Sequence, residues 1–243
     1  MTERGMRRFW KAVEVAKEAD GWSVALDGRP LRTPAKAPFL VPTEALARRV
    51  AAEWAAQGER VDPASMPFTR SANSAIDRVA PAHAEVASIV AAYAETDLLC
   101  YRATHPAELA RRQAEAWDPL LDWAASALGT PLKATVGIVP VAQPSASLAA
   151  LAEEVRRHDP FALAALHDLV ALSGSLILGL AVAKGRLSPD RAWELSRLDE
   201  DWQEAQWGTD EDAAAVAAAR RRDFLHAAAF LSLLGEKGAP AAA

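Results

Sequence analysis

Carboxylates are concentrated in one stretch of the sequence, residues 194–212, where Arg197 is the only basic side chain. Asp201 and Glu204 are three positions apart, so on a helix they would share a face. Paired carboxylates can perform acid–base catalysis or bind a metal ion. A row of them can also form a solvated helix face, or a surface that steers a basic partner protein. We favour the docking surface and keep the solvated face as the alternative.

Two of the eight tryptophans, Trp202 and Trp207, fall in this acidic segment. Most of the others occupy positions typical of a hydrophobic core. Tryptophan is also favoured at protein interfaces, because it covers much area at little cost in conformational entropy. The segment therefore combines two kinds of side chain that suit a protein-docking surface.

The sequence shows no common catalytic motif. It has no glycine-rich phosphate loop followed by Lys and Ser or Thr, and no Gly-x-Ser-x-Gly elbow. Gly174 and Gly179 lie inside a predicted helix, where small residues favour close helix packing. None of the five histidines forms the i, i+4 pair typical of zinc sites. We interpret Cys100 as a small buried hydrophobic side chain. We therefore predict a protein that is not an enzyme and has no cofactor or metal.

The composition suits a globular protein, with half of the residues hydrophobic and a net charge of −5. This acidic balance argues against a nucleic-acid partner, because binding phosphates needs clustered Lys and Arg. The lone Cys100 implies no oxidising compartment, and no secretory signal is visible. The longest apolar stretch, residues 169–183, is shorter than the roughly 20 residues of a spanning helix. It predicts a buried core helix and no membrane insertion, and we expect a cytoplasmic protein.

The N-terminal part of the sequence has the pattern of β structure. Residues 9–15 mix alternation with β-branched residues, and residues 22–26 alternate strictly. Asp27-Gly28 is a strong signal for a two-residue hairpin, so residues 29–33 should return antiparallel. Residues 39–41 form a further short strand. The pattern predicts a small antiparallel sheet.

Helical signals follow the strands. Thr43 is the predicted N-cap of a first helix that ends at Gly58, and this helix completes an N-terminal unit, residues 1–62. Residues 63–243 form a predicted helical domain with an extended insert at 135–141 and a frayed tail from Gly235 to Ala243. Its helices are predicted at residues 69–79, 82–98, 106–128, 146–157, 160–183, 189–207 and 211–234. The fold class is therefore α+β.

Six stretches occur in the order and at the spacing of a known protein family. These are Arg8–Trp10, Leu26–Pro34, Val41–Ala47 with Glu53 and Trp54, Glu95–Arg102, Trp117–Trp123, and Leu195–Gln203 followed by Trp207, Gly208 and Glu211. Over nearly its whole length the chain resembles the assembly chaperones of the F1 α subunit of ATP synthase, found in mitochondria and in some bacteria.

The resemblance implies a small N-terminal α/β unit with antiparallel strands, joined to a larger, orthogonal α-helical bundle. It implies that the protein binds the unassembled F1 α subunit until the β subunit displaces it, in the bacterial cytoplasm or, for eukaryotic relatives, in the mitochondrial matrix. An acidic residue important in the family matches Glu211. The partner-binding candidates are Glu211, Asp210, Trp207, Asp201 and Trp202.

Two alternatives remain open at this point. The first is a small-molecule enzyme with a site between the β unit and the helical bundle, where Asp97, Arg102 and the region of Glu211 would be candidates. Asp97 and Arg102 could instead pair with each other within a buried helix end. The second alternative is an adaptor with a different client protein.

Overall fold

The computed structural model describes residues 6–235, which form two compact units. The unit that we call the sheet unit comprises residues 6–83, 160–164 and 229–235. The unit that we call the helical unit comprises residues 84–159 and 165–228. Of the tail predicted to be frayed, residues 236–243 lie outside the described residues. The division into domains 1–62 and 63–243 stays a prediction.

The central strand of the sheet unit is β2 (Gly21–Leu26). It pairs antiparallel with β1 (Val13–Glu18), β3 (Arg29–Pro30) and β4 (Leu40–Val41). The hairpin predicted at Asp27-Gly28 is confirmed, because it joins β2 to β3 and both residues have positive φ, 48° and 74°. Positive φ at both central positions is what such a two-residue turn requires.

The first strand begins at Val13, four residues later than the predicted start at residue 9. The side chain of Asp27 explains the delay. Its Oδ1 accepts hydrogen bonds from the N–H groups of Ala12 at 2.8 Å and Lys11 at 3.0 Å. These bonds hold the pKa of Asp27 below its usual value. Because both amides are bound to a carboxylate, the strand ladder starts only after them.

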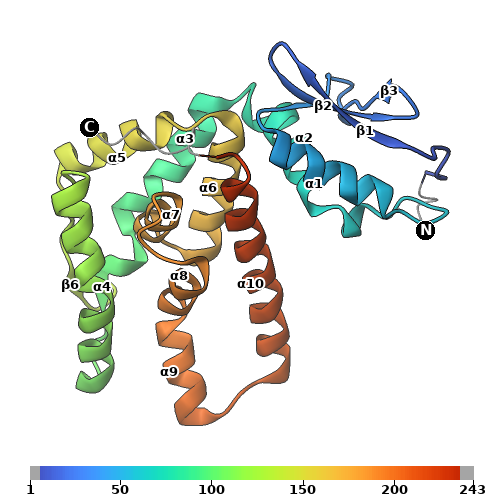
Figure 1. The fold of residues 1–243 in the computed structure, drawn as a ribbon. Helices are drawn as coiled ribbons and strands as arrows, with labels where there is room; N and C mark the ends of the chain where they lie inside the picture. Colours follow the sequence, from blue (N-terminus) through green and yellow to red (C-terminus); the bar gives the residue numbers. More distant parts are fainter. Residues whose placement is uncertain (1–5, 236–243) are drawn as a thin grey trace. The chain divides into compact units, whose positions relative to one another are not determined.

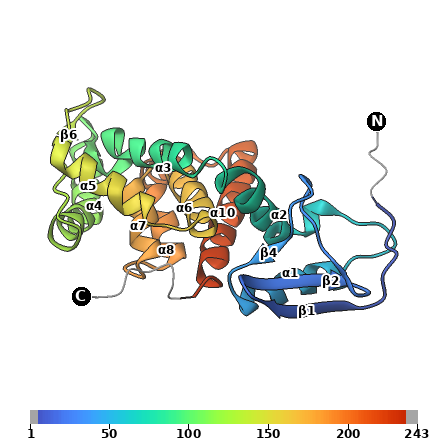
Figure 2. The same ribbon diagram turned by 90° about the horizontal axis from the view of Figure 1, so that it is seen from above.

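Helix α1 (Glu44–Ala55) begins as predicted, since Thr43 Oγ1 accepts the N–H of Leu46 at 3.2 Å. Figure 2 shows α1 lying along β1 and β2, against which it packs its buried face. The same helix carries the cap of α2 (Pro67–Ser74). The buried carboxylate of Glu53 accepts the N–H groups of Phe68 and Thr69, each at 2.8 Å. The short turns η1 (Pro63–Ser65) and η2 (Ala75–Val79) flank α2.

The remaining elements follow in chain order, and most of their residues belong to the helical unit. They are α3 (His83–Ala92), η3 (Tyr93–Thr96), η4 (Leu98–Cys100), β5 (Tyr101–Arg102), α4 (Ala107–Ala127), β6 (Thr135–Val136), α5 (Ser145–Arg156), α6 (Pro160–Ser173), α7 (Leu176–Ala183), α8 (Pro189–Ser196), α9 (Leu198–Trp207) and α10 (Glu211–Ser232). The predicted α+β class, with antiparallel N-terminal strands and a helical C-terminal region, is confirmed. Of the predicted extended insert, residues 135–136 form a strand, which pairs parallel with β5.

Helix α7 forms the centre of the helical core. Residues 176–181 are all buried, and α7 packs against α4 and α8 (Figure 1). Each fully buried Leu or Ile contributes about 1.5–3 kcal/mol through removal of apolar area from water. Within residues 6–235, every helix is too short or too polar to span a bilayer. Separately, the burial of residues 176–181 makes this part of the apolar run a piece of the protein core.

The prediction of one continuous helix over residues 160–183 was wrong. Gly174, with φ of 71°, ends α6, and Ser175 caps α7 by accepting the N–H of Leu178 at 3.0 Å. The helix predicted over residues 189–207 is also divided, at Arg197. There the indole N–H of Trp117 donates to the carbonyl of Leu195 at 3.0 Å. In an unbroken helix that carbonyl would accept the amide four residues later.

Candidate partner-binding surface

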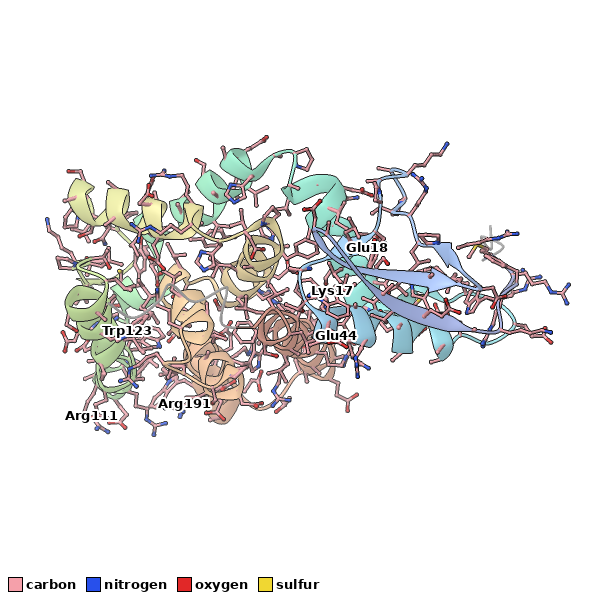
Figure 3. All side chains as sticks on the ribbon, turned by 45° about the horizontal axis from the view of Figure 1, so that its top comes forward. Lys17, Glu18, Glu44, Arg111, Trp123 and Arg191 are labelled. Carbon is pink, nitrogen blue, oxygen red and sulfur yellow. The ribbon has the colours of Figure 1, made fainter. Side chains whose placement is uncertain are left out.

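Helix α9 presents two faces with different neighbours. One face packs on α4, where the guanidinium of Arg112 lies 4.6 Å from the ring centroid of Trp202. On the same face, Gln113 Nε2 donates to Asp199 Oδ1 at 2.6 Å. Arg111, the neighbour of Arg112, projects outward at the edge of the unit (Figure 3). The contacts of Trp202 therefore anchor α9 to the helical unit and leave it only partly accessible.

The other face of α9 lines a groove between α9 and α10. The groove has a volume of about 620 Å³. From α9 it is lined by Glu200, Gln203, Glu204 and Trp207, and from α10 by Ala213, Val216, Ala217 and Arg220. Both sets follow the i, i+3, i+4, i+7 spacing of one helix face. The α9–α10 turn closes one end, with Gly208 and Asp210 in the lining.

The predicted candidates Trp207, Asp210 and Glu211 meet at this turn. Trp207 is 80% exposed at the end of α9. Asp210 Oδ1 accepts the N–H of Ala213 at 3.0 Å, which caps α10. Glu211 is exposed in the first helical turn, where the helix dipole favours a carboxylate. The turn thus joins one large apolar side chain and neighbouring acidic groups.

Arg197 is surrounded by carboxylates at the start of α9. Its guanidinium lies 3.2 Å from Glu204, 3.4 Å from Glu200 and 3.8 Å from Asp201. Partial burial raises the pKa of Asp201, and the neighbouring carboxylates raise it further against the lowering effect of Arg197. Asp201 is exposed but does not line the groove. One guanidinium group therefore lies beside three carboxylates, so the net charge at this end of the groove is negative.

Asp97 and Arg102 do not pair with each other. Asp97 is completely buried and accepts the N–H groups of Leu99 and Ile177, each at 3.0 Å. Arg102 instead pairs with the carboxylate of Asp118, and its Nη1 donates to the carbonyl of Leu99 at 2.7 Å. Both charged groups hold the backbone in place around η4.

Cys100 lies between these two residues and is buried, as predicted. Burial raises the pKa of its thiol to about 12, and the charge of Asp97 adds to this effect. A thiol with this pKa supplies almost no thiolate at neutral pH, and thiolate is the nucleophilic form. Among residues 6–235, no group of three His, Cys, Asp or Glu side chains is placed to hold a metal ion.

Sequence reasoning missed the contribution of α10 to this surface. Val216, Ala217 and Arg220 line the groove, although only the start of this helix carried candidates. The helical spacing from Ala213 was readable in the sequence. However, small side chains at that spacing also occur on solvated faces, so only the structure reveals that they face α9.

Comparisons with known proteins agree over most of the chain. The family model described as ATP12 chaperone protein matches residues 7–125. The crystal structure of Atp12 from Paracoccus denitrificans is 54% identical and superposes with a TM-score of 0.92, covering 94% of this chain and 98% of that chain. An aspartate-to-lysine mutant of the P. denitrificans protein gives 53% identity, the same TM-score, and coverage of 94% and 97%.

A relative from fission yeast extends the agreement to a eukaryote. The mitochondrial protein atp12 of Schizosaccharomyces pombe is 26% identical over 245 residues, which covers 96% of this chain and 84% of that protein. Both P. denitrificans structures share more than half of their residues with this chain over almost their entire length, and they have the same fold. The chain therefore belongs to the ATP12 chaperone family.

Proposed function

We propose that this protein is an assembly chaperone of ATP synthase that binds the unassembled F1 α subunit until the β subunit displaces it. Membership of the ATP12 family supports the chaperone role. The identity of the client follows from the resemblance of the six sequence stretches. An unassembled subunit of a ring exposes large apolar interfaces that aggregate, so covering such a surface is a useful activity without any catalysis.

The observation that carries the proposal is the exposure of Trp207 beside Asp210 and Glu211. Trp207 is 80% exposed, although its indole is one of the largest apolar groups in the chain. Tryptophan in this setting is typical of an interface anchor that becomes buried when a partner binds. The flanking carboxylates would steer a basic client surface and fix its orientation. We assign Glu211, Asp210, Trp207, Asp201 and Trp202 to client binding.

The affinity for the client must be moderate, because the β subunit has to displace the chaperone. A surface of one large anchor with an acidic rim suits this requirement, since exposed charge pairs add little affinity each. We place this assembly step in the bacterial cytoplasm. The enzyme alternative receives no support from Asp97 and Arg102, because both are engaged in structural contacts and neither lines the groove between α9 and α10.

Charge reversal at Glu211 tests the proposal. No hydrogen bond or ion pair of Glu211 is found within residues 6–235, so Glu211→Lys should leave the fold intact. We expect binding of purified F1 α subunit to weaken by about tenfold, equivalent to about 1.4 kcal/mol. Co-elution with the α subunit, and release on addition of the β subunit, is the measurement.

The control is Glu85→Lys, the same change at an exposed position on α3 outside the groove. It should leave client binding within about twofold of the wild-type value. Undiminished binding by Glu211→Lys would remove Glu211 from the docking surface. Failure of the wild-type protein to bind the α subunit would refute the client assignment.

A further inference from the structure

At the end opposite the α9–α10 turn, the groove between α9 and α10 continues into a second hollow. This hollow has a volume of about 420 Å³ and shares Arg197, Glu200, Gln203 and Arg220 with the first. Its remaining lining includes Leu98 from η4, Leu172 from the end of α6, and Gly174 from the turn between α6 and α7. The two hollows share lining residues and therefore form one trough along α9, with lining residues from both α9 and α10. Figure 1 shows these two helices and the turn that joins them.

The trough combines apolar side chains with acidic ones. Val216 is 60% exposed on the α10 wall, and Trp207 is 80% exposed on the α9 wall. Five carboxylates contribute to the lining: Asp199, Glu200, Glu204, Asp210 and Asp212. These exceed the two arginines of the lining, Arg197 and Arg220. The trough therefore carries net negative charge and has apolar side chains that could anchor a partner.

Neither arginine of the lining is free to bind an acidic ligand, because each already has a partner within the protein. Arg197 already lies within 3.5 Å of Glu200 and Glu204. Arg220 Nη2 donates to the carbonyl of Leu172 at 3.0 Å, which connects α10 to the end of α6. An occupant that presents positive charge to the rims would complement the excess of carboxylates.

We propose that this trough binds an amphipathic helical segment of the client, with apolar side chains on one face and Lys or Arg on its flanks. The inference deepens the proposed function and rests on it for the identity of the client. A helix suits the trough better than an added strand, because the walls are helices whose backbone groups are already bonded. Helix-in-groove recognition then relies on side chains at i, i+3, i+4 and i+7.

Filling the trough tests this inference without changing any charge. Ala217 faces the trough, so Ala217→Trp would place an indole where the client helix lies. Ala215, two residues earlier, is exposed on α10 and does not line the trough. Ala215→Trp is therefore the matched control. We expect Ala217→Trp to weaken binding of purified F1 α subunit by at least about tenfold, and Ala215→Trp by less than about twofold.

Synthetic peptides test binding to the trough independently of the identity of the client. A peptide with leucines at helical spacing and flanking lysines should bind the wild-type protein. It should bind Ala217→Trp at least about tenfold more weakly, and its affinity should fall as salt is raised. The same peptide with glutamate in place of lysine should not bind. If Ala217→Trp does not fold by circular dichroism, Val216→Ser replaces it, since this change removes an exposed apolar anchor without adding bulk.

The outcomes distinguish this inference from the proposed function. If the α subunit binds wild type and Ala217→Trp equally, the trough is not the binding site, although the chaperone role stands. If the α subunit does not bind while the lysine peptide binds wild type and loses affinity for Ala217→Trp, the trough is supported and the client assignment fails. Equal binding of the lysine and glutamate peptides would overturn the charge selection.

Discussion

At the scale of single residues, Asp97 shows two opposed effects on one carboxyl group. Complete burial disfavours its charge and raises its pKa to about 6. Hydrogen bonds from the N–H groups of Ile177 and Leu99 favour the charge and oppose that rise. The motif around Asp97 was visible in the sequence, but Ile177, whose N–H group Asp97 accepts, is far away along the chain. The role of Asp97 in capping α7 was therefore not predictable.

The raised pKa of Asp97 predicts a pH-dependent contribution to stability. An aspartate in the unfolded chain titrates near pH 4, so the folded state binds this proton more tightly. The contribution is present below about pH 4 and is lost as the pH rises through about 6. We expect the difference in unfolding free energy, wild type minus Asp97→Asn, to fall by about 3 kcal/mol between about pH 4 and pH 7.

Urea unfolding of both proteins across this pH range gives the measurement, and groups common to both cancel in the difference. A difference that rises with pH would show that the amide hydrogen bonds outweigh the burial and that the pKa is lowered instead. Thr69→Ser, which keeps the hydroxyl that donates to Glu53, serves as a control variant with a pH-independent difference from wild type.

At the scale of elements, the contact between α6 and α7 depends on Gly179. A Cβ at this position would lie 2.6 Å from Val170 Cγ2 and 3.2 Å from Leu166 Cδ1. Both distances are shorter than ordinary van der Waals contact. The predicted close packing by small residues is therefore confirmed at Gly179.

Gly179→Ala should destabilise the protein although alanine is the better helix former. The gain in helix propensity is about 1 kcal/mol, while overpacking a core costs about 1–3 kcal/mol. We expect a net loss of up to about 2 kcal/mol in the free energy of unfolding, measured with urea. Gly58→Ala is the control, because no heavy atom lies within 4 Å of a Cβ there. In a protein that already carries Val170→Ala, the further change Gly179→Ala should cost less free energy of unfolding than it does in wild type. An equal cost in the two backgrounds would refute the steric explanation.

The division of two predicted helices shows what local patterns could not reveal. The Ser173-Gly174-Ser175 interruption lay within the apolar run, yet the periodicity continued across it. At Arg197 no glycine or proline marks the break. The residue that occupies the carbonyl of Leu195 is Trp117, on another helix. Start signals such as Thr43 succeeded because a cap and its helix are adjacent in sequence, whereas these breaks depend on distant partners.

At the scale of the whole molecule, the sheet unit is built from three separate parts of the chain. Thr43 Oγ1 donates to the carbonyl of Leu233 at 2.6 Å, and the ring of Phe68 lies 6.4 Å from that of Phe230. The sequence predicted the strands and the class of fold, because these follow from local alternation and turns. It did not predict that the end of α10 returns to the N-terminal sheet unit, since no local pattern encodes that contact.

The shared helix α10 allows the independence of the two units to be measured. Phe230, in the sheet unit, stacks near Phe68, whereas Phe224, in the helical unit, lies 5.6 Å from Trp193. Truncating a buried Phe to Ala costs about 3–5 kcal/mol. We expect Phe230→Ala to reduce hydrogen-exchange protection in α1 and α2, and Phe224→Ala to reduce it in α8. Each variant is the control for the other, because both remove the same buried ring from one helix. Equal loss of protection in all three helices for both variants would show that the two units unfold as one cooperative body.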